Sequence, residues 1–538
     1  MSDPAIDTGI YTLDNGCPIN NVQGSLRVGN QLAGVHLIRD INLIETIAHT
    51  VHERIPERVV HAKGHGAFGT FEVTNEDFDI SEFTDADFLS EKGKTTQLFS
   101  RFSTVVGERG SADSVRDTRG YAFKLYTTQG NLDWVFFSTP TFPIRDGGKF
   151  PSFVHCQKRH PQTGLRDPAT FWDFMSRNPE TFHTLMYIFS DAGTPKSYRF
   201  ADIFSVNTYK FTKRGLLTVP IEPPLPETYH YVRLRFQTDQ GVQNLNQTEA
   251  EQLTGTDPDA YSRDLFNSIS AGQFPSWTVE AQILAPDQIA EYPVNVFDPT
   301  KEWPPALTPW RKFGKITLNT NPTDAFGETE QVSFNPANVV PGWDVSPDPI
   351  LQTRLLAYGT ASRYRLGINA SQLPINAASA ASAYNPTKRD GAHYVNPFIP
   401  AVQPNYIPAE GAPFRPEAAN TLAQDADKWA GRVTDYISQV VDDDFTQPRE
   451  IWEGYKAAGT DEAFVENVAT ALGNGVPEEV LARTLDVFNK IAEDLAARIK
   501  KAITPPPKDP KDDVPELPGG GGRFHHGPAR PNRGGVGG

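Results

Sequence analysis

The chain has 538 residues, 38% of them hydrophobic, and a formal net charge of −16. This length exceeds one hydrophobic core of ordinary size, so we expect one large domain with appendages or two domains. The negative charge argues against nucleic-acid and anionic-membrane partners, since both bind basic patches. Cys17 and Cys156 are the only cysteines, which excludes a disulfide framework and indicates an intracellular, cytoplasmic protein.

Targeting signals are not evident in the sequence. No apolar run approaches the 18 residues that a membrane-spanning helix needs. The start of the chain lacks the basic and apolar regions of a secretory signal. The last three residues, Val536-Gly537-Gly538, differ from the C-terminal peroxisomal targeting signal Ser-Lys-Leu. A peroxisomal location is possible but is not indicated by such a signal.

Strand-like runs dominate the first half of the chain. Residues 1–50 are expected to form an N-terminal arm that ends in a helix over 35–49. Between 51 and 319, alternating runs bounded by Gly, Asp and Asn predict strands, and two patches predict helices at 168–189 and 248–269. The strands are expected at 97–106, 121–127, 131–137, 228–238, 276–284 and 314–319. Such a pattern indicates a large antiparallel β-barrel with inserted helices, an α+β fold.

The second half changes character twice. Residues 320–435 are rich in Pro and Asn, with helical spacing only over 350–365, and are expected to wrap over the barrel or a neighbouring subunit. Residues 436–503 turn to helical spacing and predict three or four helices. The Gly- and Pro-rich tail, 504–538, is expected to be disordered, with His525 and His526 solvated there.

One helical segment places a tyrosine four residues after an arginine. Arg354 and Tyr358 are therefore expected on one helix face, with the guanidinium in reach of the phenol oxygen. Holding a phenol ionised at neutral pH costs about 4 kcal/mol, which an arginine and a ferric iron together can supply. Tyrosinate is an axial ligand of haem iron in some proteins. Arg363 and Arg365 follow, as candidate partners for haem propionates; a surface helix with solvated arginines is the alternative.

A second landmark surrounds His61. Arg58 precedes this histidine, and three glycines, at 64, 66 and 69, follow it. A histidine in a strand is more often a core residue than a catalyst. Here the arginine is a candidate propionate partner, and the glycines are expected to let the backbone approach a flat group.

Read together, these two segments closely resemble the haem catalase family. Further runs match in the same order: Arg101-Phe102-Ser103-Thr104, Arg116-Asp117-Thr118-Arg119-Gly120, Phe150-Pro151-Ser152-Phe153-Val154-His155 and Lys388-Arg389-Asp390-Gly391. The resemblance spans about 13–502 and implies the catalase fold of the small-subunit type, a homotetramer, and haem b as cofactor.

The resemblance also implies a role for each matching residue. Tyr358 would ligate the haem iron with support from Arg354. His61 would be the distal acid and base, with Ser103 hydrogen-bonded to its far ring nitrogen. Val105 and Asp117 would line the access channel. The remaining cofactor-binding positions are Arg58, Val60, Arg101, Val135, Phe142, Phe150 and Arg365.

The distal side departs from the family pattern. The family has an asparagine on the strand that here reads Val135-Phe136-Phe137-Ser138, and Phe137 stands at its position. Loss of one polarising donor from a preorganised site typically costs about 10²–10³ in rate. Strand alternation sends Phe136 and Phe137 to opposite faces, so only one should face the haem. The alternative is that Ser138 or a water replaces the amide.

Two further regions depart as well. Ala361 and Ser362 replace a threonine and a histidine beside the haem. NADPH binds some members: the matching positions keep His183, Ser190, Trp303 and Gln447 but change others to Ala192, Asp202, Phe204 and Gln237. A 2′-phosphate needs cationic partners, so tight NADPH binding is not expected unless Arg233 or Arg235 compensates.

Three functions remain open. We favour an oxidoreductase that oxidises an organic substrate in secondary metabolism, for example by the oxidative cyclisation of the chanoclavine-forming type, with peroxide, superoxide or dioxygen. The alternative is a catalase that dismutates hydrogen peroxide. A non-catalytic haem-binding protein is the third, and the joint presence of His61, Ser103, Arg354 and Tyr358 argues against it.

Overall fold

The computed structural model describes residues 9–29, 34–213, 228–379, 387–395, 406 and 433–503. The predicted disordered tail with its two histidines lies outside these residues. No helix in these ranges is long and apolar enough to span a membrane.

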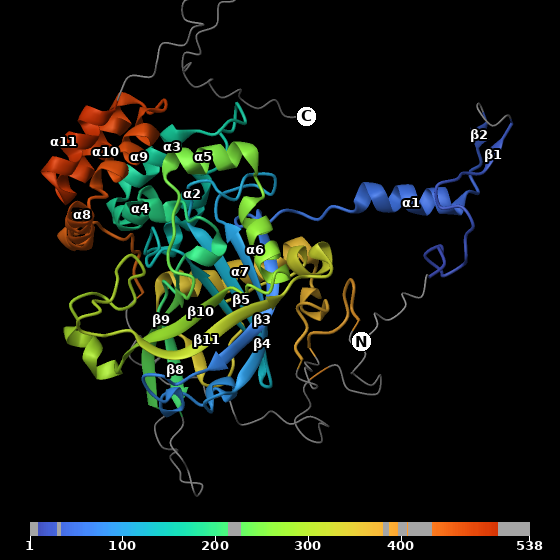
Figure 1. The fold of residues 1–538 in the computed structure, drawn as a ribbon, viewed down its shortest axis with the longest axis horizontal. Coiled ribbons are helices and arrows are strands. Elements are labelled where there is room, and N and C mark those ends of the chain that lie inside the picture. Colours follow the sequence, from blue (N-terminus) through green and yellow to red (C-terminus); the bar gives the residue numbers. More distant parts are fainter. Residues whose placement is uncertain are drawn as a thin grey trace, which may run out of the picture.

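A closed β-barrel forms the centre of the molecule (Figure 1). The strands pair antiparallel in the order β10-β11-β3-β4-β5-β6-β7-β9, and β9 pairs with β10 to close eight strands, while β8 and β12 extend from β9. This confirms the predicted fold class. The bounds are β3 Gly64–Val73, β4 Thr95–Thr104, β5 Arg119–Thr127, β6 Gly130–Phe137, β7 Ile203–Phe204, β8 Tyr209–Lys213, β9 Thr228–Thr238, β10 Ser276–Leu284, β11 Arg311–Thr320 and β12 Trp343–Val345.

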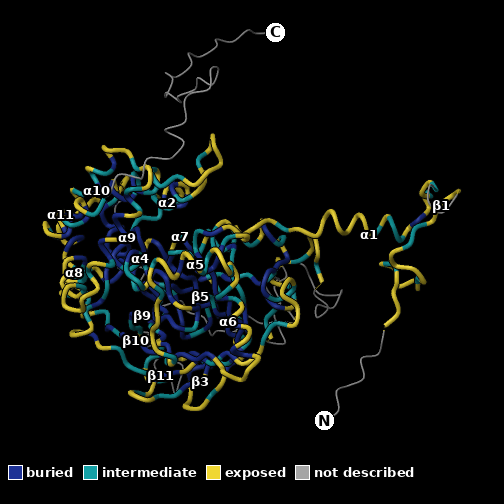
Figure 2. The backbone as a smooth tube through the Cα atoms, turned by 45° about the horizontal axis from the view of Figure 1, so that its top comes forward, coloured by how far each residue is buried: buried dark blue, intermediate teal, exposed yellow. Residues whose placement is uncertain are grey.

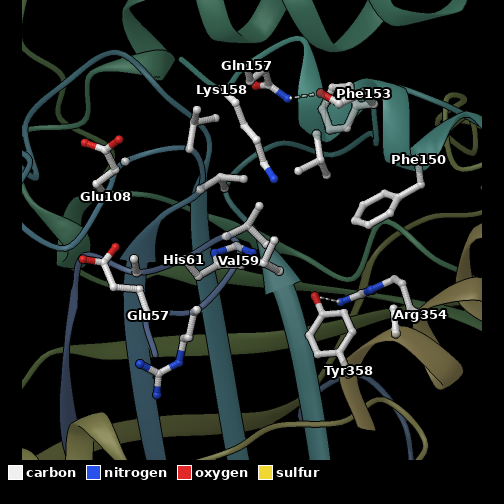
Figure 3. A pocket seen from close by; sticks show the side chains of 18 of the residues that line it. Glu57, Val59, His61, Glu108, Phe150, Phe153, Gln157, Lys158, Arg354 and Tyr358 are labelled. Carbon is white, nitrogen blue, oxygen red and sulfur yellow. Dashed lines mark hydrogen bonds between the residues drawn. The ribbon is translucent and has the colours of Figure 1, made fainter. Parts of the chain in front are cut away.

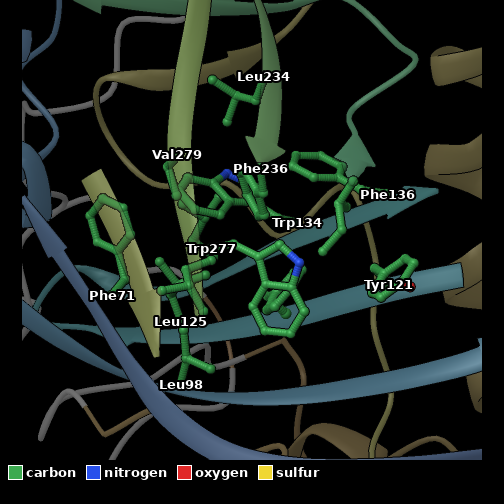
Figure 4. Packing of buried hydrophobic residues seen from close by; sticks show 14 of the residues in the cluster. Phe71, Leu98, Tyr121, Leu125, Trp134, Phe136, Leu234, Phe236, Trp277 and Val279 are labelled. Carbon is green, nitrogen blue, oxygen red and sulfur yellow. The ribbon is translucent and has the colours of Figure 1, made fainter. Parts of the chain in front are cut away.

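Aromatic side chains fill the barrel interior (Figure 4). Trp134 and Phe136 of β6 both point inward, and their rings lie 5.5 Å and 5.3 Å from Phe236. The contact between Phe136 and Phe236 is edge-to-face, and such a contact adds about 0.5–1.5 kcal/mol beyond the area that it buries. Because side chains alternate along a strand, Val135 and Phe137 point to the outer face, where the site lies.

Helices form a second apolar core beside the barrel. Trp172, Phe182, Trp452 and Phe488 are buried there, and the rings of Phe182 and Phe488 lie 4.9 Å apart. The four helices that the structure describes between residues 446 and 502 confirm the predicted helical C-terminal region. The helices of this part are α2 Phe150–His155, α3 Pro168–Arg177, α4 Phe182–Phe189, α8 Thr446–Ala458, α9 Asp461–Gly473, α10 Glu478–Ile491 and α11 Glu493–Ala502, while α5 Gln247–Thr256 and α6 Ala260–Ser270 lie over the barrel.

The N-terminal arm extends away from the body (Figures 1 and 2). The helix predicted over 35–49 begins later, since Val35–His36 is a strand, β2, paired with β1 (Arg27–Val28). Helix α1 runs over Ile41–His52 because Asp40 caps it, accepting a hydrogen bond from the Leu43 amide at 3.1 Å. None of its residues is buried.

Helix α7 (Pro349–Leu366) confirms the helix predicted around 350–365. Asp348 caps its first turn by accepting hydrogen bonds from the amides of Ile350 and Leu351, and Pro349 occupies its first position. It ends before Gly367, whose φ of 93° suits glycine. The helix is packed against the outer face of the barrel, next to β6, and carries the residues of the proximal side. The division at 50, 319, 435 and 503 remains a prediction.

Candidate functional site: a cavity between His61 and Tyr358

A cavity of about 430 Å³ lies between the barrel wall and α7 (Figure 3). His61 lines one side and Tyr358 lines the other. Val60, Phe150 and Phe142 contribute apolar walls. A second cavity of about 200 Å³, lined also by Arg101, Ser103, Val135 and Arg365, adjoins it and shares His61 and Tyr358. The structure thus brings the predicted site residues together around one space.

His61 lies in an unusual backbone conformation. Its φ is 65°, a left-handed value that costs a non-glycine residue of order 1–3 kcal/mol. Two contacts hold it: its amide donates to the Val105 carbonyl at 2.9 Å, and its carbonyl accepts from Arg101 at 2.7 Å. We expected His61 inside a strand; it lies three residues before β3, where this backbone aims the ring into the cavity.

The imidazole of His61 is held neutral. Burial, followed by the charges of Arg101 and Arg354, lowers the pKa of His61 from 6.5 to about 3. Its Nδ1 lies 3.0 Å from Ser103 Oγ on β4, so Nε2 is the nitrogen left for chemistry in the cavity. This is the predicted His–Ser pair.

The three glycines after His61 serve the barrel rather than a flat ligand. A Cβ on Gly64 would meet the Phe102 carbonyl at 2.3 Å, and a Cβ on Gly66 would meet the Phe99 ring at 2.4 Å. A Cβ on Gly69 would meet the Thr317 carbonyl of β11 at 2.2 Å. These glycines therefore permit close strand packing, and our expectation for them was wrong.

Arg354 binds the phenol oxygen of Tyr358, as their spacing predicts. Its Nη2 donates to Tyr358 Oη at 3.2 Å and to the Val135 carbonyl at 2.6 Å, and its Nη1 donates to Asn207 Oδ1 at 2.5 Å. Asn207 in turn donates to Asp348 at 2.7 Å. The guanidinium is buried, so these partners fix its position beside the phenol.

Three arginines surround a single carboxylate at one end of the site. Arg58 and Arg365 lie 3.4 Å and 4.0 Å from the carboxylate of Glu330. Burial, then the neighbouring charges of Arg101 and Arg365, lowers the pKa of Arg58. Burial also lowers the pKa of Arg101 to about 10. Three guanidiniums beside one carboxylate leave an excess of positive charge that suits an anionic ligand.

The distal face is apolar, as Phe137 predicts. The ring of Phe137 lies 5.9 Å from the ring of His61, and Phe136 points into the barrel instead. Ser138 does not take the place of the missing amide. Its hydroxyl accepts from the Arg119 amide at 2.9 Å, and it lines a different cavity. Gln157 also lines the His61 cavity, but on the side away from Tyr358 (Figure 3).

On the proximal side, Ala361 and Ser362 line the smaller cavity, as expected. Arg365 is buried, and it donates to the carbonyls of Glu330 and Val332 at 2.5 Å and 2.9 Å. Arg363 is exposed and lines neither cavity, because it lies half a turn from Arg365 on α7. Of our two propionate candidates on this helix, only Arg365 faces the site.

These features fit an iron porphyrin. A phenol oxygen beside a buried guanidinium suits a ferric ion, and the apolar walls suit a macrocycle. The arginine cluster supplies charge for two propionates: Nη1 of Arg58 and Nε of Arg101 are buried without a hydrogen-bond partner among the described residues. Within the described residues, no group of three or more His, Cys, Asp and Glu could hold a metal ion.

The closed eight-stranded barrel and the paired His–Ser and Arg–Tyr contacts are the features expected of a haem oxidoreductase. The comparisons then give the family. The family model "Catalase" matches residues 12–412, and the model "Catalase-related immune-responsive" matches residues 438–503. The chain belongs to the catalase family and is an enzyme of that family.

Relatives support this assignment over most of the chain. Catalase A of Botryotinia fuckeliana is 48% identical over 472 residues, which cover 87% of this chain and 94% of the relative. The peroxisomal catalase of Candida albicans is 42% identical, with coverage of 92% and 98%. The solved structure of catalase A from Saccharomyces cerevisiae superposes with a TM-score of 0.86 at 39% identity, covering 92% of this chain and 99% of that one.

Four of the positions that correspond to an NADPH site line a separate cavity of about 290 Å³: Ala192, Asp202, Phe204 and Trp303. It is lined by Asp202 and Glu302 and also by Arg233 and Arg235. Neither arginine is free: Arg235 pairs with Glu280 at 2.6 Å, and Arg233 donates to the carbonyls of Lys301, Val296 and Asp298. The lining therefore has no charge excess for the phosphates of NADPH, and these residues do not fit it.

Two residues of the site were missed in the sequence. Gly120 leaves the space that His61 occupies, since a Cβ there would lie 2.5 Å from His61 Nδ1. Asn207 joins Asp348 to Arg354. Gly120 lies in a run that matches the family. The match indicates that the region is important, but it does not indicate that Gly120 makes room for His61. Nothing near Asn207 in the sequence points to Arg354, because 147 residues separate them.

Proposed function

We propose that this protein is a haem-dependent catalase that dismutates hydrogen peroxide to water and dioxygen. The observation that carries the proposal is the pair His61–Ser103 facing the pair Arg354–Tyr358 across one cavity. The names of the relatives also support peroxide as the substrate. They favour this function over the organic oxidation that we preferred from the sequence.

Each residue of the site has its own role in the proposed reaction. When bound, the haem would supply two electrons to one peroxide, which is reduced to water, and regain two electrons from a second peroxide, which is oxidised to dioxygen. His61, with its lowered pKa, takes a proton from one peroxide oxygen and delivers it to the other. Ser103 fixes the orientation of the imidazole. Arg354 stabilises negative charge on the Tyr358 oxygen.

Peroxide-dependent oxidation of an organic molecule is a second candidate function. Phe137 supports it, because this ring packs 5.9 Å from His61 where the family pattern has an amide. An apolar ring does not polarise peroxide but does contact an apolar guest. Dioxygen or superoxide is the alternative oxidant for such a reaction.

Oxygen evolution from hydrogen peroxide by the purified haem protein separates the two functions. A turnover within about tenfold of a catalase with the distal asparagine supports dismutation. A deficit of about 10²–10³, the usual effect of removing one polarising donor, supports organic oxidation. In that case, mass spectrometry of a cell extract incubated with enzyme and peroxide should show a consumed metabolite.

Assembly and cofactors complete the proposal. We infer a homotetramer from the resemblance to the catalase family. The exposed apolar side chains on the projecting helix α1 support contact with another subunit, since such a face is normally covered; they are Ile41, Ile44, Ile47 and Val51. Haem b is the proposed cofactor.

NADPH is not proposed as a cofactor, because the lining of the separate 290 Å³ cavity has no excess of positive charge. The location inside the cell stays a prediction; some relatives are named as peroxisomal.

A further inference from the structure

The His61 cavity has two ends of opposite chemistry. An unbroken series of aromatic rings runs from above His61 toward the surface: Phe137 lies 5.8 Å from Phe142, which lies 6.0 Å from Phe153 on α2. Val105, Val154 and Ile350 add aliphatic surface to this wall. Beyond the wall, the lining becomes charged.

Lys158 stands at the charged end. Figure 3 shows its side chain running into the cavity, with the ammonium on the side of His61. Its ammonium has no hydrogen bond or ion pair with any residue that the structure describes. The neighbouring cation, Arg159, is instead held by both carboxylate oxygens of Glu108, at 2.6 Å and 2.8 Å. Lys158 is thus available to a ligand in a way that Arg159 is not.

The charge balance at this end favours an anion. Glu57 and Glu108 line it together with Lys158, Arg159 and Arg166, which leaves one positive charge in excess. The pKa of Glu108 is lowered, first by its hydrogen bond to Arg159, so this carboxylate stays ionised and keeps Arg159 engaged. The excess charge therefore resides on the cations that lack such a partner.

We propose that this cavity binds an organic carboxylate with an apolar body, and that Lys158 is its specificity-determining residue. The carboxylate pairs with the Lys158 ammonium, and the apolar body lies along Phe153, Phe142 and Phe137 toward His61. The proposal deepens the second candidate function, on which it rests, by naming the substrate class. Lys158 is exposed, so its contact with a carboxylate contributes at most about 1 kcal/mol, which corresponds to roughly fivefold in affinity.

The test uses three probes with one apolar body: 4-phenylbutyrate, 4-phenylbutan-1-ol and 4-phenylbutylamine. Each is titrated into the haem-loaded enzyme, and binding is followed by the haem absorption band and by calorimetry. We expect the carboxylate to bind about two- to fivefold more tightly than the alcohol or the amine. Equal affinity of the acid and the alcohol would overturn the proposal.

Variants assign the preference to one side chain. Lys158→Met should weaken binding of 4-phenylbutyrate about two- to fivefold and leave binding of the alcohol unchanged, while Lys158→Arg should retain most of the affinity. Lys92→Met is the matched control, since Lys92 is exposed near the opposite end of β4 and should have no effect. Unchanged binding of the acid by Lys158→Met would refute the assignment.

Azide distinguishes a specific contact between Lys158 and the carboxylate from a general attraction of anions to positive charge. This small anion binds haem directly, so Lys158→Met should alter its affinity less than twofold. An equal loss for azide and 4-phenylbutyrate would also overturn the proposal. All these measurements report binding and not turnover, so they stand whether or not the enzyme evolves oxygen from peroxide.

Discussion

The ring of His61 lies directly against the bare Cα of Gly120, where any Cβ would come within 2.5 Å of Nδ1 and 2.9 Å of Ser103 Oγ. The imidazole and its hydrogen-bond partner therefore both depend on a missing side chain on β5. Two residues that the chain separates by 59 positions form one feature of the site, and this relationship leads to a direct test.

Gly120→Ala should displace His61 and lower peroxide turnover by at least tenfold while the enzyme keeps its haem. The physical reason is steric, since the ring and the Ser103 hydroxyl cannot both stay in place. Oxygen evolution and haem content of the purified protein measure the two effects. Gly454→Ala is the control: it lies in α8 and its added Cβ meets nothing within 4 Å. Full activity of Gly120→Ala would contradict the described geometry.

Phe137→Asn should raise the rate of oxygen evolution, by up to about 10²–10³ if the amide is the only missing donor. The amide would polarise peroxide where the ring cannot. Phe137→Leu keeps an apolar side chain and serves as the control, with no expected gain. If the asparagine variant is no faster than the leucine variant, the aromatic ring is not what limits dismutation.

Asn207→Leu should loosen the proximal side. The change leaves buried Arg354 and Asp348 without their shared partner, and an unsatisfied buried group costs about 1–3 kcal/mol. We expect a lower thermal midpoint together with a reduced ratio of haem to protein. Asn244→Leu, at a position that lines the separate cavity of 290 Å³, provides the comparison. A variant that has a lower thermal midpoint but the normal ratio of haem to protein would show that Asn207 has only a structural role.

The pH dependence should show no acid limb near pH 6.5. Because the pKa of His61 is lowered to about 3, the imidazole stays neutral, and kcat/KM should be flat between pH 7 and pH 5. Lowering the pH should destabilise the folded protein through this residue. The unfolded chain gains a proton at this residue below pH 6.5 and the folded one does not, so stability falls by about 1.4 kcal/mol per pH unit as pH drops from 6.5 toward 3.

NADPH should bind weakly, with calorimetry of the purified enzyme giving a dissociation constant in the millimolar range. Replacing Ala192 by Arg and Asp202 by Asn adds a cation and removes an anion from the cavity lining. This double variant should bind at least tenfold more tightly, as expected for a charge-assisted contact to phosphate. Retention of NADPH by the unmodified protein through purification would show that other groups compensate.

Sequence patterns predicted those parts of the fold that depend only on residues close together in the chain, such as strand alternation and helical spacing. Two strands, at 228–238 and 276–284, have the predicted bounds, and the four-residue spacing of Arg354 and Tyr358 placed both on one face of α7. Alternation on β6 correctly separated Phe136 from Phe137. The start of α1 was wrong because the cap at Asp40 was overlooked, although the residue type signals it.

Contacts between distant segments lay beyond the sequence. Nothing local shows that Gly120 makes room for His61, or that Arg101 holds the His61 carbonyl. The glycines at 64, 66 and 69 were assigned to a ligand because a missing side chain can serve a ligand or a neighbouring strand equally well. Only the barrel register decides between them.

The crowding of Arg58, Arg101 and Arg365 around Glu330 has a consequence for the life of the protein in the cell. Without anions from a prosthetic group, these buried like charges repel one another, so the proposed haem would also be a counter-ion that stabilises the fold by mass action. Loading and folding become linked equilibria. Scarcity of porphyrin should therefore reduce the amount of this protein as well as its activity, since the unloaded chain is the form that proteases reach first.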